Sequence, residues 1–154
     1  MSISFKKIQW IMAVAALVSV VGLAAGTLFG ADSAQTNDQR TRLGLSDEEK
    51  LVITELLPNV PGKRITVTVV SYAPGQKSGQ HHHPGSVVAY VLSGAIRSEN
   101  SATGPVKVYK AGESFFEPPG SHHLISENAS AKEPASLLAV HVADDGAKLT
   151  AFVK

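Results

Sequence analysis

The chain has 154 residues, with 14 Lys or Arg, 13 Asp or Glu, a formal net charge of +1 and no cysteine. Lys6, Lys7 and Asp32 precede residue 35, so the rest carries 12 charges of each sign without a block of like charge, which argues against a nucleic-acid partner. Thiolate chemistry and disulfides are excluded, and a domain of about 120 residues can bury a sufficient core without them.

Residues 1–30 resemble a targeting segment. Lys6 and Lys7 precede an uncharged, mostly apolar run of 22 residues, 8–29. The run is longer than the core of a typical signal peptide and long enough to span a bilayer. A cleaved signal peptide and an uncleaved N-terminal membrane anchor both stay open. Either would deliver the folded part across the membrane, so we expect it to be periplasmic, secreted, or tethered through 8–29 to the inner membrane facing the periplasm.

The next segments lead into the folded domain. Residues 31–45, mostly small and polar, are interpreted as a linker, and 46–154 as the domain. Ser46 and Glu49 have capping-box spacing, yet β-branched residues follow and Pro58 prevents a long helix. We predict one helical turn and then a strand over about 50–57.

The remaining chain is a series of short β-type runs, most of them bounded by Gly, Pro, Asn, Asp or Ser. The predicted strands cover 65–72, 86–92, 95–99, 106–110, 114–118, 122–126, 136–142 and 149–153. Strands at this spacing predict an all-β antiparallel sandwich or small barrel.

Six histidines offer candidate metal ligands. Residues i and i+2 of a strand share a face, so His81 and His83 would project together and His82 would turn away. A third nitrogen would come from elsewhere. Either His122 or His123 would face inward, and His141, in an otherwise apolar strand, is a further candidate.

The spacing of glycines, histidines and a proline in two segments resembles the cupin family. The first segment has Gly75, five residues, His81-x-His83 and later Gly94; the second has Gly112, five residues, Pro118-x-Gly120-x-x-His123. The resemblance spans roughly 64–141 and is close to small exported bacterial single-domain cupins. It implies a double-stranded β-helix, or jelly-roll barrel, in which His81, His83 and His123 ligate a divalent transition metal. It also implies a homodimer.

Two positions depart from the family pattern. The usual glutamate of the first motif falls at Val87, which cannot bind a metal, and the usual asparagine of the second falls at Glu127, one residue before Asn128. Three neutral imidazoles would leave the ion its full +2 charge, a more Lewis-acidic site that attracts anionic substrates. Such a set suits Zn²⁺, Cu²⁺, Ni²⁺ or Fe²⁺ better than Mg²⁺ or Mn²⁺.

Glu117 is the candidate catalytic residue. If its strand directs Phe115 and Glu117 inward, the carboxylate could approach the ion or act as a general base through bound water; the alternative is a rim residue in water. Tyr90, Tyr109, Gln80 and His141 are weaker pocket candidates.

Three functions are compatible with these features. The first is a metal-dependent enzyme, such as a dioxygenase, isomerase or hydrolase, that acts on a small, anionic or chelating organic molecule. The second is a non-catalytic module of the same fold that binds or senses a metal or small ligand. The third is a purely structural cupin whose site holds no metal.

Overall fold

A computed structural model describes residues 37–153 of the chain. Within this range the chain forms ten β-strands. Their bounds are β1 Glu49–Leu56, β2 Lys63–Tyr72, β3 His81–His82, β4 Ser86–Ser93, β5 Ala95–Asn100, β6 Gly104–Lys110, β7 Ser114–Glu117, β8 His122–Asn128, β9 Ala135–Asp144 and β10 Ala151–Phe152.

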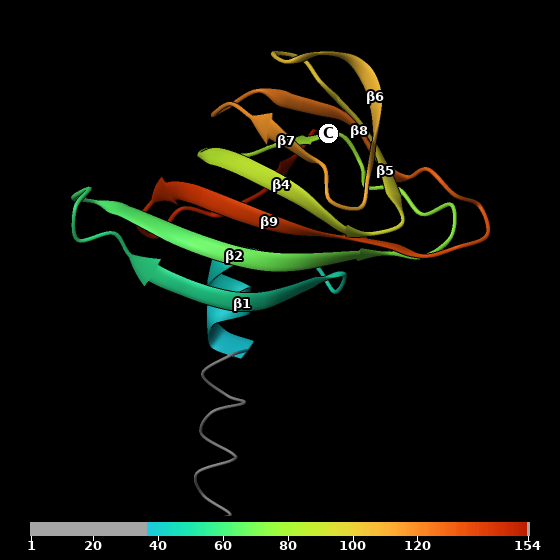
Figure 1. Cartoon of the computed structure of the whole chain (residues 1–154). Coiled ribbons are helices and arrows are strands. Elements are labelled where there is room, and N and C mark those ends of the chain that lie inside the picture. Colours follow the sequence, from blue (N-terminus) through green and yellow to red (C-terminus); the bar gives the residue numbers. More distant parts are fainter. Residues whose placement is uncertain (1–36, 154) are drawn as a thin grey trace, which may run out of the picture. The chain divides into compact units, whose positions relative to one another are not determined.

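The strands form two five-stranded sheets (Figure 1). One sheet has the order β1-β2-β9-β4-β7 and the other β10-β3-β8-β5-β6. Every paired strand is antiparallel, and most neighbours are distant in sequence, as in a jelly roll. The predicted all-β barrel is therefore confirmed.

Strict alternation of side chains places the core between the sheets. In β9 every second residue from Ala135 to Ala143 is buried, and in β4 the buried positions are Val87, Ala89 and Val91. The apolar members of these two sets, except Ala143, pack with residues from both sheets into one apolar cluster. Its buried members are Tyr72, Val87, Ala89, Val91, Ile96, Phe115, Ala135, Leu137 and Ala139.

The segment before β1 differs in part from the expected linker. Residues 37–43 are helical, and Leu43 is buried in a small apolar cluster with Ala143 and Leu149. Leu149 also donates its amide to the carbonyl of Leu43 at 3.0 Å. The folded unit therefore begins before residue 46, because an apolar residue in an otherwise polar segment is anchored by the C-terminal loop.

The turn predicted at Ser46 is present, and the strand after it begins at Glu49, one residue early. The amide of Glu49 donates to the carbonyl of Ser46 at 3.1 Å. In return, the Glu49 carboxylate accepts a hydrogen bond from the Ser46 amide at 2.9 Å. This reciprocal pair makes a single turn that leads directly into β1.

The export or anchor segment expected at 1–30 lies outside the described residues. Within 37–153, no helix has the length and apolar character needed to cross a membrane.

Gly94 lies in the tight turn between β4 and β5, where there is no room for a side chain. Its φ is +67°, and a Cβ there would lie 2.7 Å from the Pro134 carbonyl oxygen. Gly62 has a similar φ of +76° but open space around it. We expect Gly62→Ala to lower the free energy of unfolding by about 1–2 kcal/mol through backbone strain alone. Gly94→Ala should lower it by a further 1–3 kcal/mol or so because of the clash.

Urea unfolding of the two variants measures this difference directly. Equal losses for Gly94→Ala and Gly62→Ala would contradict the close packing of the β4–β5 turn against the start of β9.

Candidate metal centre

The pairing of β3 with β8 brings three histidines together. His81 lies opposite His123, and His82 lies opposite His122. His81, His83 and His123 are buried, whereas His82 is half-buried and His122 exposed. The predicted orientations of the His81–His83 pair and the preference for His123 over His122 agree with this arrangement.

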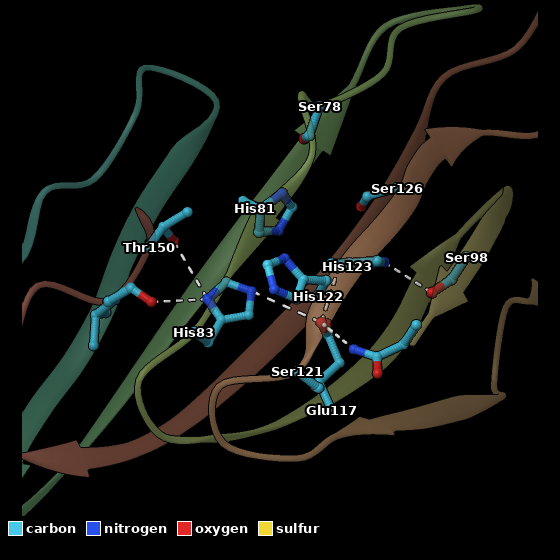
Figure 2. Close-up of polar contacts among 12 residues, drawn as sticks. Ser78, His81, His83, Ser98, Glu117, Ser121, His122, His123, Ser126 and Thr150 are labelled. Carbon is cyan, nitrogen blue, oxygen red and sulfur yellow. Dashed lines mark hydrogen bonds and ion pairs between the residues drawn. The ribbon is translucent and has the colours of Figure 1, made fainter. Parts of the chain in front are cut away.

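The three rings are held by hydrogen bonds on their outer nitrogens, and Figure 2 shows those of His83 and His123. Nδ1 of His81 lies 2.7 Å from the Gly79 carbonyl oxygen, and Nδ1 of His83 lies 2.8 Å from that of Leu149. A carbonyl only accepts, so in the neutral ring Nδ1 carries the proton and Nε2 keeps its lone pair. His123 is bound on the other nitrogen, with Nε2 2.8 Å from Ser98 Oγ.

The remaining nitrogens fit a shared metal ion. One ligand atom from each of the three histidines lies within 4.8 Å of the others. Nδ1 of His123 is buried and makes no hydrogen bond within residues 37–153. Glu117 Oε2 lies 3.0 Å from this nitrogen without forming a hydrogen bond to it, and a metal ion would supply the partner that a buried nitrogen needs. The three histidines are therefore positioned for metal binding.

The opposite sheet adds Glu117 and His141 to the same space. Both are only 3% exposed. Glu117 Oε2 lies 3.0 Å from His123 Nδ1 and 3.9 Å from His83 Nε2 (Figure 2). The His141 ring packs edge-on against His83, with centroids 5.1 Å apart. The expected inward orientation of Phe115 and Glu117 is present, so Glu117 is not a solvated rim residue.

Burial sets the charge states of this cluster. Loss of solvent lowers the pKa of His81 to about 4 and that of His141 to about 3. Burial by itself raises the pKa of Glu117, but its contact with His123 and its electrostatic interactions with His123, His83 and His81 outweigh burial, and the net direction is down. At neutral pH His81 and His141 are therefore neutral, and the Glu117 carboxyl is ionised.

Two polar residues of β5 hold the cluster in place and were not identified from the sequence. Ser98 contacts His123, and Asn100 donates its Nδ2 to Glu117 Oε2 at 3.3 Å. Both are at least 95% buried. The available signal was the alternation in "AIRSEN", which turns Ser98 and Asn100 to the same inner face as Ile96.

Asn128, displaced by one residue from the family pattern, has a structural role. It is buried, and its Nδ2 donates to the carbonyls of Ala73 and Glu133 at 3.0 and 2.8 Å. Its side chain thus ties the loops after β2 and β8 together. Glu127 faces the other way and pairs with Arg97.

The weaker pocket candidates lie in different places in the structure. Tyr90 is 44% exposed on the outer face of β4, and Gln80 is exposed. Tyr109 packs against Phe115 and the apolar core, with ring centroids 4.8 Å apart. Of the four, only His141 lines the cavity beside the histidines.

That cavity has a volume of about 250 Å³. One part of its wall is formed by the histidines and Glu117, and the rest is a mixture of polar and apolar side chains. It includes aliphatic side chains and the hydroxyl groups of Tyr72, Ser78 and Ser126. The Tyr72 hydroxyl lies 2.8 Å from Ser126 Oγ and 3.2 Å from Ser78 Oγ, which fixes these groups inside the barrel.

The family model of the cupin domain matches residues 68–141, which contain both motifs and all of the buried histidines. The chain belongs to the cupin superfamily. None of the curated proteins compared with this cupin matches it.

Several solved structures share the fold. An uncharacterised protein with a double-stranded β-helix domain from Klebsiella pneumoniae is 24% identical with a TM-score of 0.54, over 71% of this chain and 88% of that one. A cupin-like protein from Thermotoga maritima is 19% identical with a TM-score of 0.52, over 68% and 74%. The DMSP lyase DddQ from Ruegeria pomeroyi is 19% identical with a TM-score of 0.50, over 58% and 43%. At these identities the likeness establishes the fold alone.

Acid should destabilise the metal-free cupin. His81 and His141 are neutral in the fold because their pKa values are lowered to about 4 and about 3. Between these values and about 6.5 the unfolded chain binds more protons than the folded one. The contribution of these two histidines to the free energy of unfolding should therefore be fully present above about pH 6.5 and fall by about 3 kcal/mol for each of them as the pH decreases to 4.

Urea unfolding at several pH values, with a chelator present, measures this dependence. His141→Gln should show a shallower fall below pH 6.5, and His122→Gln, which changes an exposed histidine, should follow the parent. A parent stability that stays constant from pH 7 to pH 4 would contradict the burial of neutral histidines.

Proposed function

We propose that this cupin binds a divalent transition metal through His81, His83 and His123 and acts on a small organic molecule held in the adjacent cavity. The observation that carries the proposal is the orientation of the three buried rings. Their outer nitrogens are bound to Gly79, Leu149 and Ser98, and their ligand atoms converge. Such second partners fix the direction of ligating histidines in metal sites.

Three imidazoles suit Zn²⁺, Cu²⁺, Ni²⁺ or Fe²⁺. When bound, such an ion supplies Lewis acidity that polarises a substrate oxygen and lowers the pKa of bound water. The protein supplies the surroundings. Glu117 places an ionised carboxylate beside His123, where it can hold or accept a proton, and Asn100 orients that carboxylate.

The cavity favours a small and partly polar molecule. Its volume of about 250 Å³ is below the usual range of drug-sized pockets. His141 lines it, and its buried Nε2 makes no hydrogen bond in the part of the chain that the structure describes. Together with the hydroxyl groups of Tyr72, Ser78 and Ser126, it offers polar contacts that orient a ligand between aliphatic walls.

An enzyme is favoured over a passive binder because a buried carboxylate and an unpartnered imidazole both adjoin the histidine cluster. Groups of this kind are concentrated at catalytic sites. The DMSP lyase that shares the fold is an enzyme, but its reaction belongs to that protein. Oxygenation, isomerisation and hydrolysis are the reaction types to test. Periplasmic or secreted location and a homodimeric state stay predictions from the sequence.

Metal analysis of the purified, untagged protein tests the binding site. We expect one divalent metal ion per chain in the parent and its loss in His83→Ala, because Nε2 of His83 faces the cluster. His82→Ala is the matched control, since its ring lies on the other side of β3, and it should keep the metal. A His83→Ala protein that is folded and holds as much metal as the parent would contradict the assignment of His83 as a metal ligand.

Substrate screening tests the catalytic part. The metal-loaded protein would be incubated in air with catechols, flavonoids, thiols and dicarbonyls, and products followed by mass spectrometry. We expect turnover of at least one class, lost in His83→Ala and retained in His82→Ala. Ligand binding without turnover across the panel would favour a binding or sensing module instead.

A further inference from the structure

We propose that Glu117 is the fourth protein ligand of the metal site, supplied from β7 in place of the glutamate that the first motif lacks at Val87. The inference rests on the three-histidine site proposed above. It assigns Glu117 to the ion itself and not only to proton transfer through bound water.

Strand register places Glu117 beside the missing ligand. Val87 on β4 pairs directly with Glu117 on β7, and both side chains face inward, with exposures of 2% and 3%. Directly opposite residues of antiparallel strands have Cβ atoms about 5 Å apart on the same face. A glutamate side chain is long enough to cover that offset. A carboxylate lost from position 87 is thus replaced by one from the neighbouring strand.

The distances from Glu117 to two of the three histidines agree with shared coordination. Two ligand atoms that each lie about 2.1 Å from an ion are about 3.0 Å apart at a right angle and about 4.2 Å apart when opposite. Glu117 Oε2 lies 3.0 Å from His123 Nδ1 and 3.9 Å from His83 Nε2. Both separations fall between these two limits, and neither nitrogen carries another hydrogen bond that would compete for its lone pair within residues 37–153.

The surroundings of Glu117 call for a cation. Its partners within residues 37–153 are Asn100, His83 and His123, and no lysine or arginine pairs with it there. A buried carboxylate without a compensating positive charge is strongly unfavourable. Asn100 donates a single neutral hydrogen bond at 3.3 Å, which orients the carboxylate but does not neutralise it. A divalent ion at the cluster would neutralise it.

This assignment changes the expected chemistry of the site. Three neutral histidines and one carboxylate leave a divalent ion with a net charge of +1, not the +2 that Val87 alone suggests. The bound ion should be less Lewis acidic, and an oxygen ligand widens the set of suitable metals toward Mn²⁺.

Metal affinity and the Co²⁺ absorption spectrum test the proposal without any substrate. Zn²⁺ affinity would be measured by competition with a chromophoric chelator, in the full chain. Glu117→Gln keeps the size of the side chain and should weaken binding at least tenfold or so and alter the Co²⁺ spectrum. Glu99→Gln, on the outward side of β5, is the matched control and should change neither.

A ligand swap makes the test independent of any loss of folding. Glu117→Val should weaken binding, and the double variant Val87→Glu, Glu117→Val, which returns the carboxylate to the family position, should restore it. A folded Glu117→Gln protein with the parent's affinity and Co²⁺ spectrum would overturn the inference. If His83→Ala still loses the metal in that case, the proposed metal site stands; a parent that binds neither ion would overturn both.

Discussion

The antiparallel pairing of β3 with β8 is the constraint on which the site depends. It sets His81 opposite His123, and a slip of β3 by one residue would turn the His81 ring away from the interior. β3 has only two residues, so its register is reinforced from both sides. The Ser78 amide donates to the Ser126 carbonyl at 2.9 Å, and the Gly120 amide donates to the His83 carbonyl at 2.7 Å. These flanking bonds hold the histidines where a two-residue strand alone could not.

The two sheets contribute different chemistry to the same interior. The sheet containing β3 and β8 supplies the histidines, and the other supplies a row of inward side chains in which Val87 lies between Glu117 and His141. An ion bound by both sheets would link them. Metal binding would then contribute to folding free energy as well as to function, because the separated ligands of the unfolded chain form no such site.

The fold and the histidine set could be predicted because they depend on local pattern. Period-two alternation oriented the His81–His83 pair, and turn residues separated the strands. Geometry alone left His122 and His123 open, and only the spacing of the second cupin motif selected His123. The roles of Ser98 and Asn100 could not be predicted, because they depend on β5 pairing with β8 and on Asn100 reaching Glu117 of the other sheet. That arrangement is set by the packing of the whole barrel.

The structure also changes the interpretation of Val87. From the sequence, its apolar side chain removes a ligand and leaves a more acidic ion. In the structure it lies in the apolar core while Glu117, thirty positions later, is buried on the neighbouring strand and close to His123. The loss of a ligand at one motif position therefore does not mean that the site lacks a carboxylate, because a residue on the neighbouring strand can reach the same interior.

The central claim is a metal ion held by the three histidines between the two sheets. Anomalous diffraction from crystals of the metal-loaded protein, collected above and below the absorption edge of the metal, tests it most directly. The account predicts a single strong peak at about 2.1 Å from one nitrogen each of His81, His83 and His123. A loaded crystal with no peak among these rings, or with its ion bound elsewhere, would contradict it.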